Sequence, residues 1–120
     1  MGLGYSKQPV KADISDKTGS RILDTVYHNT TGRPILCIVS LDCDRANGVN
    51  YYCFGQAKVE NVTPPTDIVA YGGLYLADNV MEEIYAVITF AIPNEWYYLV
   101  KNNNDGISSV GIKKWVEVTL

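Results

Sequence analysis

The chain has little positive charge, and the charge it has is scattered. Its 120 residues include ten Lys and Arg against 13 Asp and Glu, a formal net charge of -3. Proteins that bind nucleic acids need a basic patch or stripe to neutralise phosphates. The sequence shows no such stripe, so it argues against DNA or RNA as a partner.

Long apolar runs are also lacking. No segment approaches the roughly 20 apolar residues that a membrane-spanning helix needs. The first residues, MGLGYSKQPVKAD, show no apolar core of a secretory signal. We therefore expect a soluble protein made in the cytosol, without membrane insertion.

Residues that bind metals or form covalent intermediates are few. The chain has three cysteines, Cys37, Cys43 and Cys53, and one histidine, His28, with no C-x-x-C motif and no zinc-ligand spacing. Cys37 lies in an apolar run and is expected to be a small buried hydrophobe. A bridge between Cys43 and Cys53 remains an alternative. We expect no metal and no cofactor.

Catalytic arrangements are not recognisable either. No serine or cysteine near His28 has a nucleophile context, and the adjacent acids Glu82 and Glu83 are typical of a solvated surface. Asp42 and Asp44 resemble the start of a calcium loop, but the twelfth position is Cys53, which excludes an EF-hand. A looser calcium site at these two aspartates remains open. We expect no catalytic residues and no enzymatic activity.

The residues that are abundant favour β-structure. The sequence holds nine tyrosines, ten glycines and five prolines, which are typical of strands joined by turns. Residues 35–41 and 84–92 are apolar on both faces of the two-residue strand period. This pattern predicts two strands buried on both sides, with residues 35–41 in the middle of a sheet.

Shorter strands are predicted between turn signals. They cover residues 21–27, 51–55, 56–62, 68–70, 74–76, 96–100, 107–110 and 115–120. A break is expected at Gly72-Gly73, one helical turn within residues 77–83, and a hairpin across residues 93–95. The spacing predicts an all-β fold, an antiparallel β-sandwich or jelly roll of about seven or eight short strands. Residues 21–120 would form this domain, and residues 1–20 an extended or poorly ordered N-terminal arm.

Three short motifs are similar to those of small C-terminal domains on bacteriophage tail fibres and tailspikes. The first is Arg21, then Tyr27, then Asn29-Thr30-Thr31-Gly32-Arg33-Pro34-Ile35. The second is Ile92-Pro93-Asn94-Glu95-Trp96-Tyr97, with Glu95 where a glycine is more usual, and the third is Lys114-Trp115-Val116-Glu117. The resemblance covers roughly the last hundred residues. Its motif residues are structural and transfer no binding site.

This resemblance implies a jelly-roll knob at the tip of a virion tail fibre. Such a knob is a homotrimer that attaches to a host cell-surface glycan or outer-membrane protein. A structural virion component, such as a tail or capsid decoration protein, is the alternative, and a small carbohydrate-active enzyme is a further one. Aromatic rings and amides in loops suit sugar binding. The residues expected to contact a ligand are Tyr51, Tyr71, Asn102, Asn103 and Asp105.

Overall fold

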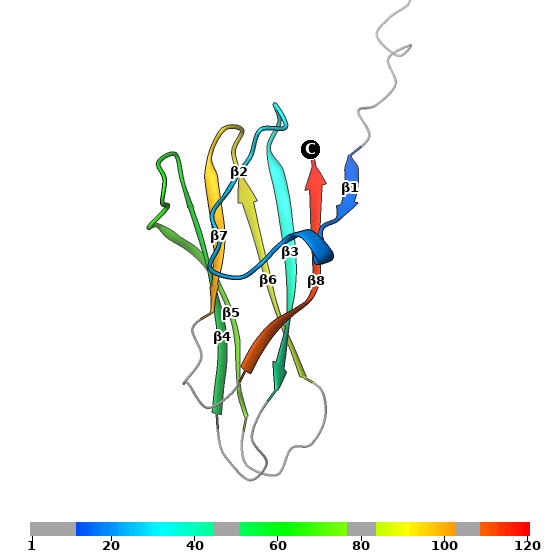
Figure 1. The fold of residues 1–120 in the computed structure, drawn as a ribbon, viewed down its shortest axis with the longest axis vertical. Coiled ribbons are helices and arrows are strands. Elements are labelled where there is room, and N and C mark those ends of the chain that lie inside the picture. The colour runs from blue at the N-terminus through cyan, green and yellow to red at the C-terminus, as the bar shows by residue number, and fades with distance from the viewer. Residues whose placement is uncertain (1–11, 45–50, 77–83, 103–108) are drawn as a thin grey trace, which may run out of the picture.

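The computed structural model describes residues 12–44, 51–76, 84–102 and 109–120, which form two facing four-stranded sheets (Figure 1). The strand order is β1-β8-β3-β6 in one sheet and β2-β7-β4-β5 in the other. The elements are β1 (Asp13–Asp16), the 3-10 turn η2 (Thr18–Ser20), β2 (Tyr27–His28), β3 (Ile35–Asp44), β4 (Tyr51–Glu60), β5 (Ile68–Leu76), β6 (Ile84–Ile92), β7 (Tyr97–Asn102) and β8 (Ser109–Thr119). Within these described ranges, no helix is long and apolar enough to cross a membrane.

The connectivity is that of a jelly roll. The first strand pairs with the last, and the pairing continues inward as β2 with β7, β3 with β6 and β4 with β5, all antiparallel. This nesting of strand pairs, divided between two sheets, is the eight-stranded double Greek key. The prediction of an all-β antiparallel sandwich is therefore confirmed.

The core lies between the two sheets and follows the strand alternation. Every second side chain of β3 and β6 points inward, and Trp115 on β8 and Tyr98 on β7 are the largest fully buried residues. Cys37 is also fully buried there, as predicted, and burial raises the pKa of its thiol. The side chains of Cys43 and Cys53 lie outside the described part of the structure, so their bridge stays an untested alternative.

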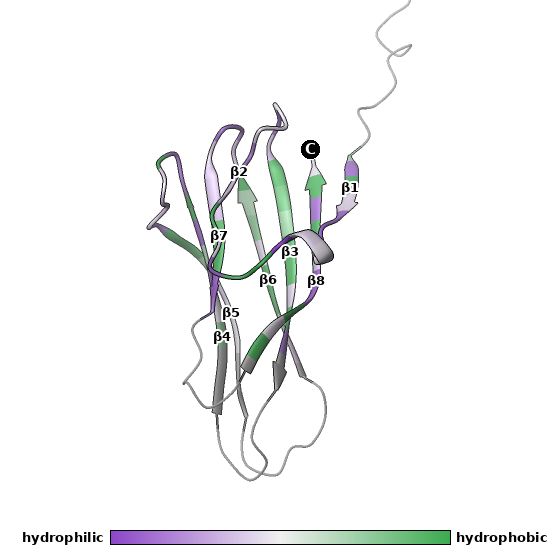
Figure 2. Ribbon diagram, in the orientation of Figure 1, coloured by the Kyte–Doolittle hydropathy of each residue, from purple (hydrophilic) through white to green (hydrophobic). Residues whose placement is uncertain are grey.

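The two strongly apolar segments differ in their surroundings. Residues 35–41 belong to β3, which lies between β8 and β6 as predicted. The expectation that residues 84–92 are buried on both sides is wrong, because β6 is an edge strand. Its outward side chains Tyr85 and Val87 are 40% and 55% exposed. A second apolar face in the sequence thus need not be a covered one. Figure 2 shows the apolar residues that run along β3 and β6.

Several predicted boundaries are also corrected. Residues 51–60 form one strand, β5 continues through Gly72-Gly73, and β8 spans both C-terminal segments. The turn at residues 93–96 joins β6 in one sheet to β7 in the other, so it is no hairpin. Gly72 lets β5 approach β6 closely, because a Cβ built on it would overlap Ile88 Cγ1, and Gly73 leaves room for the Phe54 ring of β4. Glycine here indicates packing rather than a strand end.

The N-terminal region is more ordered than an arm. Residues 13–16 form β1, paired with β8 from Asp13↔Thr119 to Asp16↔Val116, so the sandwich begins before Arg21. The strand predicted for residues 21–27 is reduced to Tyr27–His28, because residues 21–26 cross from one sheet to the other. Residues 1–11 and the helical turn predicted within residues 77–83 lie outside the described residues.

Candidate functional site

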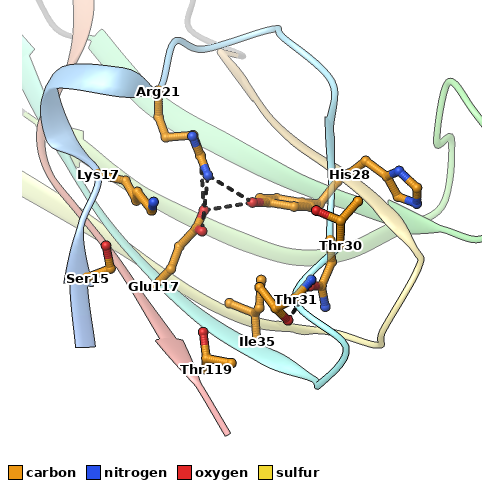
Figure 3. A pocket seen from close by; sticks show the side chains of 11 residues that line it. Ser15, Lys17, Arg21, His28, Thr30, Thr31, Ile35, Glu117 and Thr119 are labelled. Atoms are coloured by element: carbon orange, nitrogen blue, oxygen red, sulfur yellow. Dashed lines mark hydrogen bonds and ion pairs between the residues drawn. The ribbon is translucent and has the colours of Figure 1, made fainter. Parts of the chain in front are cut away.

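A buried polar cluster lies between the sheets at the side where β1 and β2 face each other (Figure 3). Glu117 on β8 is only 4% exposed. It accepts hydrogen bonds from Arg21 Nε at 3.1 Å, Tyr98 Oη at 2.8 Å and Trp115 Nε1 at 3.0 Å. A second contact, from Arg21 Nη2 to Glu117 Oε1 at 3.2 Å, makes the arginine bidentate. The buried carboxylate is thus paired and hydrogen-bonded, as a buried charge must be.

The surroundings of the cluster fix its protonation. Burial raises the pKa of the Tyr98 phenol, and its hydrogen bond to Glu117 raises it further, so Tyr98 stays a donor. Burial lowers the pKa of Arg21, but the Glu117 carboxylate outweighs this effect and the net shift is upward. The guanidinium also lies 4.4 Å from the ring centre of Tyr27. The cluster is therefore a fixed structural link between the sheets.

A cavity of about 220 Å³ opens above this cluster. Its walls come from β1 and the following turn on one side, from residues 28–31 on another, and from β8. The lining residues are Ser15, Lys17, Arg21, His28, Asn29, Thr30, Thr31, Ile35, Tyr98, Glu117 and Thr119. Most lining residues therefore carry a polar group, while the exposed surface of this small cavity is about equally polar and apolar.

Asn29 fixes the segment after β2 that forms one wall of the cavity. The side chain is 1% exposed. Its amide nitrogen donates to three carbonyl oxygens, those of Arg33, Ile92 and Pro93, at 2.9, 3.1 and 3.1 Å. Its oxygen accepts from the Thr31 backbone at 3.1 Å and hydroxyl at 2.7 Å. The Asn-Thr-Thr-Gly-Arg-Pro motif thus ties the turn before β3 to the turn after β6, which is a structural task.

His28 is held at the rim by contacts with β7 and the preceding turn. Its ring stacks on Tyr97 with centres 4.3 Å apart, and Nε2 lies 2.9 Å from the Glu95 carbonyl oxygen and 3.3 Å from the Glu95 carboxylate. These contacts join His28 to an acid and a carbonyl rather than to a nucleophile. The absence of enzymatic activity remains a prediction.

The residues predicted to bind a ligand are divided by the fold. Tyr51 begins β4 at the end of the sheet, whereas Asn102, the last residue of β7, pairs with Gly55, four residues further along β4. Tyr71 lies within β5, 66% exposed, in the row formed with Gln56 and Lys101. Asn103 and Asp105 lie outside the described residues. By strand register Asn102 is thus one row from Tyr71 and four rows from Tyr51, so the structure does not gather the three at one end.

The predicted calcium alternative stays a prediction, because residues 45–50, which follow Asp44, lie outside the described residues. Asp42 and Asp44 are strand residues of β3 and pair with Gly111 and Ser109 of β8, rather than starting a loop. Across the described ranges, no group of three or more His, Cys, Asp or Glu side chains could hold a metal ion.

Comparisons with known proteins add no relative. No protein-family model, no curated protein and no solved structure matches the chain. The resemblance to bacteriophage tail-fibre domains therefore stays a prediction.

The cavity itself was not predicted. Arg21, Trp115 and Glu117 were singled out as motif residues, but nothing in their spacing indicated that they meet. Ser15 and Lys17 had been assigned to the arm, and Thr119 had been given no role. Only the pairing of β1 with β8 brings them to the motif residues.

Proposed function

We propose that this chain is a non-enzymatic receptor-binding knob of the bacteriophage tail-fibre or tailspike type. It would attach the virion to a glycan or protein of the bacterial surface. The observation that carries the proposal is that the two ends of the sandwich differ. The described chain enters at β1 and leaves at β8 at one end, where Asp13 pairs with Thr119.

The opposite end gathers the strand ends that a receptor would meet. There β3 and β5 end and β4, β6 and β8 begin, as the pairs Cys43↔Ile84, Asp44↔Ser109 and Tyr51↔Leu76 record (Figure 1). The last residue of β7, Asn102, lies four residues short of this end, opposite Gly55. A domain carried at one end and free at the other presents its inter-strand connections outward. Binding residues are commonly placed on such connections by a rigid sandwich.

A test of attachment uses whole cells. The labelled protein is incubated with candidate host bacteria, beside a variant with Tyr51→Ala, Asn102→Ala and Asn103→Ala. We expect the triple variant to lose most of the bound signal. Asn61→Ala, on the exposed connection after β4, is the matched control and should bind like the wild type. Equal binding by wild type and triple variant would reject the predicted receptor site.

Homotrimer formation is part of this proposal, and the outer face of the β1-β8-β3-β6 sheet supports it. One row of paired residues runs across all four strands as Ile14, Val118, Leu36 and Ala91. Ile14 is 76% exposed. Exposed apolar surface of this continuity is typical of an interaction site. We propose that other copies of this chain cover it.

The position of Ile14 favours other copies as the occupant. It lies on β1, the strand by which the chain enters the domain. Copies that pack through this face would therefore bring their entering strands together, as subunits joined to one fibre require. Trimerisation would also multiply weak single-site binding through avidity.

Size-exclusion chromatography with light scattering tests the oligomer. We expect a trimer at micromolar concentration and a monomer for Ile14→Asp, with Ile22→Asp, an exposed isoleucine outside the strands, as control. A monomeric wild type would reject the trimer. A trimer that binds no cell would favour the alternative, a structural virion component.

A further inference from the structure

The cavity between β1 and β2 contains polar groups that the fold does not use. In the part of the chain that the structure describes, no hydrogen bond or ion pair engages the hydroxyls of Ser15, Thr30 and Thr119 or the Lys17 amine. All four residues line the cavity. The neighbouring Arg21 and Glu117, by contrast, satisfy each other.

The charge of the lining favours an anion. Arg21 and Glu117 cancel as a bidentate pair, so Lys17 contributes the unbalanced charge of the cavity. Its backbone is fixed, because Lys17 N donates to the Trp115 carbonyl oxygen at 2.7 Å. The backbone of Lys17 is thus held beside the cavity, and the three donors of its ammonium group stay available.

The hydroxyls and the volume favour a single sugar ring. Each hydroxyl can both donate and accept, which suits ligands that carry several hydroxyl groups. The cavity of about 220 Å³ is smaller than the roughly 300–1,000 Å³ of sites for drug-sized ligands. One pyranose ring is therefore a better match than an oligosaccharide.

We propose that this cavity binds a monosaccharide that bears a carboxylate, such as a uronic acid unit of a bacterial surface polysaccharide. Lys17 pairs with the sugar carboxylate, and Ser15, Thr30 and Thr119 hydrogen-bond to ring hydroxyls. The inference rests on the proposed receptor-binding function and names a ligand class for it. The site is separate from the end that carries Tyr51, so the two could hold different parts of one polymer.

The proposal is tested by NMR titration of the full chain with sodium glucuronate at constant ionic strength. Glucose serves as the neutral sugar and sodium acetate as the bare carboxylate. We expect glucuronate to shift the amide signals of residues lining the cavity with a Kd on the order of 1 mM, as suits a ligand of this size. Glucose and acetate should each bind at least about five-fold more weakly, because glucose lacks the carboxylate and acetate lacks the ring hydroxyls.

Variants locate the binding. Lys17→Gln should weaken glucuronate binding about five-fold or more and leave glucose binding unchanged. Lys58→Gln, on β4 and outside the cavity, is the control for lost charge and should bind like the wild type. Because the Lys17 side chain forms no hydrogen bond or ion pair with any described residue, its replacement should leave thermal unfolding unchanged.

The outcomes separate this inference from the proposed function. Equal binding of glucuronate and acetate would show that the cavity does not recognise the sugar ring. Equal binding of glucuronate and glucose would show that it does not recognise the carboxylate. Either result would overturn the proposal. No shift at the cavity with intact cell attachment would overturn the inference alone. Glucuronate binding without attachment to any cell would support the inference and count against the receptor-binding function.

Discussion

Arg21 and Glu117 are 96 positions apart in the sequence and meet in the interior as a bidentate pair, with N–O distances of 3.1 and 3.2 Å. Arg21 belongs to the crossing segment before β2, whereas Glu117 lies on β8. The pair therefore holds the crossing segment against the opposite sheet. Tyr98 adds β7 to the same carboxylate through a 2.8 Å hydrogen bond.

Removing Glu117 should be costly. Glu117→Ala leaves the Arg21 guanidinium, the Tyr98 hydroxyl and the Trp115 indole N–H without their acceptor. Breaking a buried pair on one side costs about 3–5 kcal/mol, so we expect the free energy of unfolding in urea to fall by that amount. Asp13→Ala, an exposed acid on β1, should change it by less than about 0.5 kcal/mol. A loss below about 1 kcal/mol for Glu117→Ala would contradict a structural role for the pair.

The contact of β5 with β6 yields a prediction for two glycines. A Cβ on Gly72 would lie 2.4 Å from Ile88 Cγ1 and 2.6 Å from the Val87 carbonyl oxygen, and nothing lies within 4 Å of one on Gly111. Gly72→Ala should therefore lower the free energy of unfolding by at least about 1–3 kcal/mol through overpacking. Gly111→Ala should leave it unchanged or raise it slightly. Similar midpoints of chemical unfolding for the two variants would refute this close approach.

Strand periodicity was enough to predict the fold class, because inward and outward positions alternate along each strand. It identified β3 as a central strand, and the core cysteine followed from the same pattern. It was wrong about β6, since a period of two reports which faces are apolar and not what covers them. It also divided β5 at Gly72-Gly73, where Gly72 makes room for Ile88 and Gly73 makes room for the Phe54 ring.

The cavity could not be predicted for a different reason. Its lining combines β1, the segment around Thr30 and the end of β8, which are distant in the sequence. Lys17 and Ser15 occur in a polar stretch that resembles any solvated surface. Only the pairing of the first strand with the last places them beside Thr119, and no local pattern reports that pairing.

Acid should loosen the connection between β4 and β5 through Glu60. One carboxylate oxygen, Oε1, accepts from the Thr66 backbone at 2.8 Å, the Thr66 hydroxyl at 2.9 Å and the Asp67 backbone at 3.3 Å. The hydrogen bonds from Thr66 lower the pKa of Glu60, and the bond from the Thr66 backbone N–H has the largest effect. Because the pKa of Glu60 is lower in the folded chain than in the unfolded chain, the ionised carboxylate stabilises the fold above the unfolded value of about 4.3. This stabilisation is lost as the pH falls through the folded-state pKa.

This acid response is measured by following thermal unfolding between pH 6 and pH 2. The wild type should lose stability as the pH falls below about 4.3, and Glu60→Gln should lose less over the same interval. Glu95→Gln is unsuitable as a control because Glu95 contacts His28, so Asp13→Asn is preferred. Parallel pH profiles for wild type and Glu60→Gln would show that the Thr66 hydrogen bonds do not contribute.

Glu95 occupies a backbone conformation that glycine adopts more easily. Its φ is 72°, in the left-handed region, where a side chain costs roughly 1–2 kcal/mol. The turn is held by backbone hydrogen bonds with Asn29: Glu95 N donates to the Asn29 oxygen at 2.8 Å, and Asn29 N donates to the Trp96 oxygen at 2.9 Å. The unusual residue therefore keeps the turn geometry that a glycine would give.

Two substitutions separate the backbone from the side chain at this position. Glu95→Gly and Glu95→Ala both remove the contact between the carboxylate and His28, but only glycine relieves the left-handed strain. We expect the free energy of unfolding of the glycine variant to exceed that of the alanine variant by about 1 kcal/mol, since their difference cancels the lost contact. If alanine were the more stable, the turn would have to tolerate a side chain at this φ without strain.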